Sequence, residues 1–142
     1  MKHLLLSLLI LLSSCSYSSY QLKTNCKVSN QVLFERLTGT LVNEGLQIKT
    51  VTGNYLLAES LPAKQWNGAT TQVYWAFTAS KDTITGTAKS ISIYQNAFGA
   101  VLSTSETYFN DDAHRDWTWY WNVRNELENT CGDKVIIFEV LK

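Results

Sequence analysis

The fold is decided by one stretch in the middle of the sequence, Gln72-Val73-Tyr74-Trp75-Ala76-Phe77-Thr78. Val73, Trp75 and Phe77 occupy alternate positions, so they fall on one face of an extended chain. β-Branched and aromatic residues at this period are typical of a strand with one buried face. The stretch therefore predicts a sheet that buries Val73, Trp75 and Phe77 on one side.

Further strands are predicted on both sides of this stretch. Ser80-Lys81-Asp82 is a turn, and residues 83–94, rich in Thr, Ile and Ser, form a long hairpin partner. The remaining predicted strands cover residues 46–50, 55–59 and 135–140, and the last reads as a buried strand. Residues 61–68, which contain Pro62 and an Asn-Gly pair, indicate a loop, while residues 101–109 fit either a strand or a loop.

Two segments have the apolar period of amphipathic helices. The first, residues 30–44, begins after Ser29 as N-cap and ends at Gly45. The second, residues 112–130, can be capped by Asp111 or Asp112 and ends at Gly132. Their apolar stripes consist of Leu33, Phe34, Leu37 and Leu41 in the first helix and Tyr120, Val123, Leu127 and Cys131 in the second. Together these elements predict an α+β domain of two layers, an antiparallel sheet of about four to six strands with two helices on one face, in the order α-β-β-β-β-α-β.

The amino terminus has the features of a secretory signal peptide. Met1-Lys2-His3 is a short basic start, residues 4–12 are almost wholly apolar, and two serines precede Cys15. The apolar run is too short to remain as a membrane-spanning helix, which needs about 20 residues. We therefore expect residues 1–14 to be removed.

Leu12-Ser13-Ser14-Cys15 resembles the lipobox of bacterial lipoproteins. The resemblance implies a diacylglyceryl group on the Cys15 thiol and, usually, an acyl chain on its new amino group. The alternative is an ordinary secreted protein cut after Ser14. Ser16, where the family's inner-membrane proteins carry Asp, favours an outer-membrane location facing the periplasm. Residues 15–25 would then be a lipidated tether, and residues 26–142 a single domain.

Lipidation of Cys15 would leave Cys26 and Cys131 as the two thiols of the mature chain. Exported proteins meet an oxidising compartment, where two remaining cysteines usually pair. Two isolated cysteines are too few for a zinc site, the competing interpretation. A 26–131 disulfide would place the start of the first helix beside the end of the second, so the two helices would lie antiparallel on one sheet face.

The composition excludes several classes of partner and cofactor. Without Lys2, 11 basic residues face 12 acidic ones, so there is no basic surface for nucleic acid and no polybasic patch for anionic lipid. Gly-rich phosphate loops and known metal-binding spacings are also missing from the sequence. We expect no cofactor and no metal.

Residues 110–116 form the main polar cluster and contain His114, the only histidine of the mature chain. A metal or acid–base site is one interpretation, and an exposed helix start with capping carboxylates is the other. No nucleophile elbow accompanies the cluster. We therefore expect a protein that is not an enzyme.

Aromatic residues are concentrated in Trp117-Thr118-Trp119-Tyr120-Trp121, and Trp66 lies in the predicted loop. Successive helical residues are about 100° apart, so these rings cannot all face one core, and Trp119 falls opposite the apolar stripe. It either lies along the sheet edge or joins an exposed patch for a protein, a glycan or a membrane interface. The sequence thus favours a lipid-anchored envelope protein of binding or scaffolding type, with another envelope protein as partner. The alternative is a small apolar ligand in a pocket lined by Trp75, Trp117 or Trp121.

Overall fold

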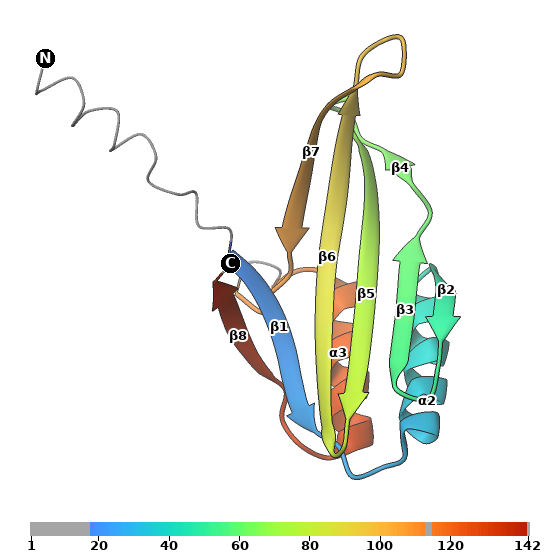
Figure 1. The fold of residues 1–142 in the computed structure, drawn as a ribbon, viewed down its shortest axis with the longest axis vertical. Coiled ribbons are helices and arrows are strands. Elements are labelled where there is room, and N and C mark those ends of the chain that lie inside the picture. The colour runs from blue at the N-terminus through green and yellow to red at the C-terminus, as the bar shows by residue number, and fades with distance from the viewer. Residues whose placement is uncertain (1–17, 113–114, 142) are drawn as a thin grey trace, which may run out of the picture.

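The computed structural model of the 142-residue chain describes residues 18–112 and 115–141. The predicted signal peptide, Cys15 and His114 lie outside them. The described part is an antiparallel sheet of eight strands with two helices on one face (Figure 1). The elements follow in the order β1 (Ser18–Asn25), α2 (Asn30–Asn43), β2 (Leu46–Val51), β3 (Tyr55–Ser60), β4 (Ala63–Lys64), β5 (Thr70–Ser80), β6 (Thr83–Gln95), β7 (Val101–Tyr108), α3 (Thr118–Cys131) and β8 (Ile136–Leu141).

The long hairpin of β5 and β6 is the centre of the sheet. Its register runs from Ser80 opposite Thr83 to Thr70 opposite Ile93. The strand order is β2-β3-β5-β6-β1-β8, and the ends of the hairpin have different neighbours. Near the β5–β6 turn the flanking strands are β3 and β1, whereas at the far end they are β4 and β7. The hairpin predicted from residues 72–94 is therefore confirmed.

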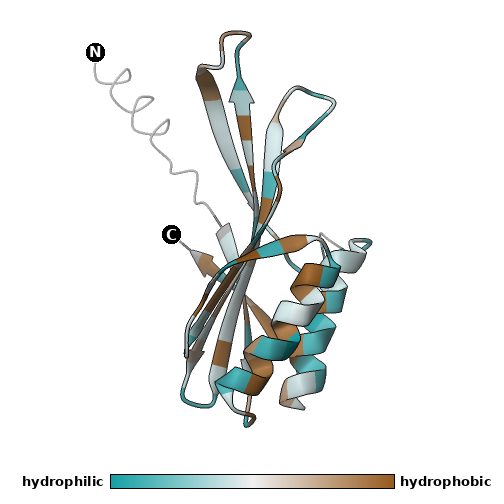
Figure 2. Cartoon of the chain, turned by 90° about the vertical axis from the view of Figure 1, so that its right-hand side faces the viewer, coloured by the Kyte–Doolittle hydropathy of each residue, from teal (hydrophilic) through white to brown (hydrophobic). Residues whose placement is uncertain are grey.

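The core lies between the sheet and the helices. Trp75 and Phe77, from the alternating stretch, are fully buried and stack with ring centroids 5.2 Å apart. The helices contribute Leu33, Phe34, Leu37 and Leu41 from α2 and Tyr120, Val123 and Leu127 from α3. These are the predicted apolar stripes, apart from Cys131, which is only half-buried. Figure 2 places both helices on the same side of the sheet.

The predicted disulfide is present and joins the segment before α2 to the last residue of α3. The Sγ atoms of Cys26 and Cys131 are 2.10 Å apart, so the start of α2 lies beside the end of α3. Arg36 of α2 faces Glu126 of α3 at 3.9 Å. The helices are thus antiparallel, as the cysteine positions predicted.

Helix α3 begins six residues later than the sequence predicted. Its N-cap is Trp117, not Asp111 or Asp112. The Asp111 carboxylate instead accepts a hydrogen bond from the Tyr120 hydroxyl (3.0 Å) and lies 2.9 Å from Arg124 Nε. Helix α2 matches its prediction, because the Ser29 side chain accepts a hydrogen bond from the Val32 amide.

The predicted sheet was too small and the predicted element order was wrong. Residues 18–25, placed in the tether, form β1, which pairs with both β6 and β8. Within 61–68 a two-residue strand, β4, pairs with β5, and residues 101–108 form β7. These segments become strands because they pair with residues far away in the sequence. Their own sequences carry little apolar pattern from which a strand could be predicted.

The last strand was wrongly predicted as buried. Among the described residues β8 pairs only with β1, which makes it an edge strand. Ile136 is 66% exposed and Phe138 is 37% exposed. Its apolar run resembles a core strand, but the burial of a strand depends on its neighbours in the sheet, which the local pattern does not show.

Candidate functional site

Part of the sheet extends beyond the helices. We call residues 62–73 and 90–105 the distal arm, which contains β4, the start of β5, the end of β6 and most of β7. Figure 2 shows these strands projecting past the helical layer and ending in two separate turns. Lys64 is the only charged residue of the arm, although 17% of the whole chain is charged. The arm is thus a nearly uncharged extension of the sheet.

Both turns of the arm are closed by hydrogen bonds and carry an aromatic side chain outward. In the first, the Gln65 amide donates to the Ala69 carbonyl at 2.7 Å, and Trp66 is 97% exposed. In the second, Asn96 Oδ1 accepts from the amides of Phe98 and Ala100, each at 2.9 Å. Phe98 is 96% exposed. The turns therefore hold two aromatic rings in solvent.

A hollow of about 330 Å³ lies on the helix-free face of the sheet. We call it the tyrosine hollow, because three of its side chains are tyrosines. Its lining comes from four neighbouring strands and consists of Tyr55, Leu57, Tyr74, Ala76, Thr87, Lys89 and Tyr108. All seven are half-buried. Alternation in β5 that buries Trp75 and Phe77 directs Tyr74 to this opposite face.

A small polar network fixes the side chains at one end of the hollow. Lys89 Nζ is 3.0 Å from Glu106 Oε1 and 5.8 Å from the centre of the Tyr108 ring. The Tyr108 hydroxyl donates to Glu106 Oε2 at 3.2 Å, and the Tyr74 hydroxyl donates to Gln72 Oε1 at 2.7 Å. Burial and the charge of Glu59 raise the pKa of Tyr74, and Lys89 opposes them. Tyr74 is thus a neutral hydroxyl at physiological pH.

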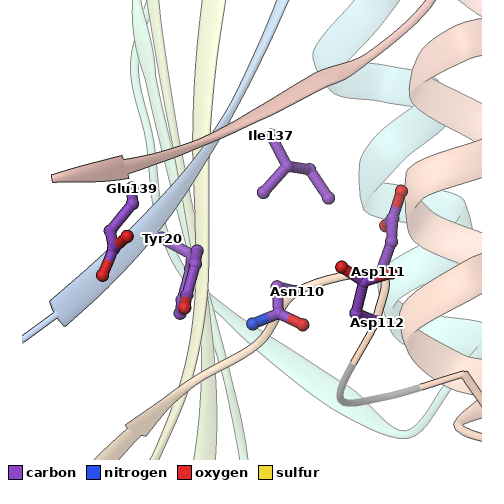
Figure 3. Close-up of a pocket in the computed structure, with 6 residues that line it drawn as sticks. All are labelled: Tyr20, Asn110, Asp111, Asp112, Ile137 and Glu139. Atoms are coloured by element: carbon purple, nitrogen blue, oxygen red, sulfur yellow. The ribbon is translucent and has the colours of Figure 1, made fainter.

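The polar cluster predicted at residues 110–116 borders a second hollow, of about 630 Å³ (Figure 3). Its lining is Tyr20, Asn110, Asp111, Asp112, Ile137 and Glu139. Asp111 is engaged by Tyr120 and Arg124, which gives this carboxylate a structural role. No three His, Cys, Asp or Glu side chains within residues 18–112 and 115–141 are placed to hold a metal ion.

The structure separates the predicted aromatic residues into two groups. Trp117 and Trp119 each lie 5.0 Å from Phe109, and Trp119 also meets the edge of Trp75 at 6.3 Å. Trp121 lies under the Arg124 guanidinium at 5.0 Å. Trp119 therefore packs against the core, and only Trp117 of the three is largely exposed, at 43%. Trp66 lies apart from them, on the distal arm.

Of the tryptophans predicted to line a ligand pocket, Trp75 lies inside the core. Trp75 is fully buried between Phe77 and Tyr120. Five hollows in this part of the chain have no tryptophan in their lining, among them one of about 800 Å³ between α2 and β2 that is lined by Phe34 and Val51 among others. The apolar-ligand alternative stays a prediction.

Sequence reasoning missed the tyrosine hollow and Phe98. The signal for the hollow was available at Tyr55 and Tyr74, since both alternate with buried strand residues. Lys89 and Tyr108 could not be added, because their positions depend on the registers of β6 with β5 and β7. Phe98 lies in the segment 95–100, for which no turn was predicted.

Neither described helix is long and apolar enough to cross a membrane. No protein-family model matches the sequence, and no curated protein and no solved structure shows significant similarity to it.

Proposed function

We propose that this chain is a bacterial lipoprotein that binds another cell-envelope protein through the helix-free face of its sheet. The observation that carries the binding role is the tyrosine hollow, built by four strands on a sheet face that the helices leave open. The proposal includes no catalytic step and no cofactor.

The anchor is proposed from the lipobox-like Leu12-Ser13-Ser14-Cys15. The Cys26–Cys131 disulfide supports export, because such bonds persist in oxidising compartments. Lipid attached at Cys15 would hold the domain on the outer membrane, facing the periplasm. Two or three acyl chains give essentially permanent attachment.

A protein partner suits the chemistry of the hollow. Tyrosine is enriched at the centres of protein interfaces, where its ring is buried and its hydroxyl finds a partner. The neighbouring strand β7 pairs only with β6 among the described residues. Its outer edge can therefore accept an added strand of the partner, whose side chains would enter the hollow.

Affinity purification from detergent-solubilised membranes tests this role. We expect one envelope protein to co-purify with the wild-type chain and to be lost with Tyr74→Ala. Asn125→Ala is the control, because Asn125 is exposed on α3, away from the helix-free face. Equal recovery of the partner with both variants would contradict the binding role, as would the absence of any recurrent partner.

A further inference from the structure

We infer that the tips of the distal arm dock into the interface of the lipid bilayer, as a second contact beside the lipid on Cys15. The inference rests on the proposed lipid anchor, and it assigns a role to Trp66 and Phe98. Its partner is the headgroup region of the membrane, the place where aromatic side chains of membrane proteins concentrate.

The directions of β1 and β6 place the start of β1 and the distal arm toward the same end of the sheet. β6 runs from the β5–β6 turn up to the arm, and β1 is antiparallel to it (Figure 1). The first described residue, Ser18, therefore lies at the end of β1 that is nearer the arm, and a tether from Cys15 would attach there.

The arm is also longer than the tether. Leu22 lies opposite Gly86, so Ser18 stands near the level of Ser90. From there β6 rises another five residues to Gln95, about 17 Å at 3.4 Å per residue, before the turn that carries Phe98. The three residues from Cys15 to Ser18 span at most about 11 Å. With Cys15 at the membrane surface, the arm reaches that surface whenever the sheet stands upright.

The composition of the arm fits a bilayer better than a protein. Its tips expose Trp66, Phe98, Leu102 (68%) and Val101 (59%), and no acidic residue occurs within the arm. An interface of lipid headgroups needs no complementary shape, and it accepts an indole ring with its N–H in the wet layer. The single charge, on Lys64, is of the sign that anionic headgroups attract.

Quenching of tryptophan by brominated lipid tests the docking. The lipidated protein is reconstituted into vesicles of phosphatidylethanolamine and phosphatidylglycerol at about 3:1, with and without bromine on the acyl chains. We expect bromine to quench the wild-type fluorescence, and Trp66→Phe to remove most of that quenching. Trp117→Phe is the matched control and keeps it, because Trp117 lies at the start of α3 against Phe109.

A charge at the other tip gives an independent variant. Phe98→Asp should lower the bromine quenching of Trp66 several-fold, whereas Asn129→Asp, which adds the same charge on α3, should leave it unchanged. A lipidated chain whose quenching does not depend on Trp66 overturns the docking and leaves the anchor intact. Mass spectrometry of the same sample identifies the other failure, because a chain without lipid contradicts the proposed anchor and with it the tether argument.

Discussion

Gly86 lies directly opposite Phe77 in the β5–β6 ladder. A Cβ atom at residue 86 would be 2.9 Å from Cδ1 and Cε1 of Phe77. The ring cannot move easily, because it is fully buried and stacked on Trp75. Glycine is therefore required here for space.

Gly86→Ala should lower the free energy of unfolding by about 1 kcal/mol or more. Overpacking of a core costs about 1–3 kcal/mol, which outweighs the 0.5–1 kcal/mol or so that alanine gains over glycine in a strand. Urea denaturation measures the difference. Gly53→Ala is the control, since nothing lies within 4 Å of its Cβ position and its change should stay within about 0.5 kcal/mol. Equal unfolding midpoints for the two variants would contradict the packing argument.

Tyr120 makes the folded protein less stable as the pH rises above 10. Burial raises the pKa of its hydroxyl far above 10.0, the Asp111 charge and hydrogen bond add to the rise, and Arg124 opposes it. Above pH 10 the unfolded chain therefore releases this proton while the folded chain retains it. Stability is fully present below pH 10 and falls as the pH rises further.

Tyr120→Phe should flatten this alkaline loss of stability. The measurement is the urea midpoint at pH 8 and pH 11 for both chains, each carrying Cys15→Ser so that no free thiol is present. We expect the midpoint of the parent to fall more than that of the variant. Parallel declines would assign the alkaline transition to other tyrosines, among them Tyr74, whose pKa is also raised.

At the level of the elements, the disulfide holds the segment before α2 against the end of α3, although the two are far apart in sequence. Cys26 and Cys131 are separated by 105 positions. Closing so long a loop restricts the unfolded chain, and native disulfides typically contribute about 2–4 kcal/mol. The double variant Cys26→Ala/Cys131→Ala, compared with its parent in the same Cys15→Ser background so that neither chain has a free thiol, should lose stability in that range by urea denaturation. An unchanged midpoint would show that the helices pack on the sheet without the bridge.

Elements with a strong local sequence pattern were predictable. Elements that form only by pairing with residues far away in the sequence were not. Helix α2 has a regular apolar stripe, an N-cap at Ser29 and a stop near Gly45, so its sequence specifies both ends. Strand β1 buries Leu22 and Thr24, yet its sequence SSYQLKTN resembles a polar linker. The start of α3 was misplaced because Asp111 serves Tyr120 and Arg124 instead of a helix end.

At the scale of the whole molecule, the sequence predicted the two layers and the helix pairing but not the distal arm. The layers follow from alternation in β5 and the stripes of α2 and α3. The arm exists because β5 and β6 continue beyond the helices, and no local pattern in the sequence marks where a helical cover ends. Of the candidate surface residues, the sequence singled out Trp66 and its alternation could have indicated Tyr74, whereas Lys89 needed the sheet register and Phe98 lies in a turn that was not predicted.

The central proposal is the lipid anchor at Cys15, because it would set both the location of the domain and the orientation of its arm. Intact mass and amino-terminal peptide mapping of the protein extracted from membranes test it directly. We predict a mature chain that begins at Cys15 and carries a diacylglyceryl group on the thiol, absent from Cys15→Ala. A chain that begins at Ser16 or earlier than Cys15, with no lipid attached, would contradict the account.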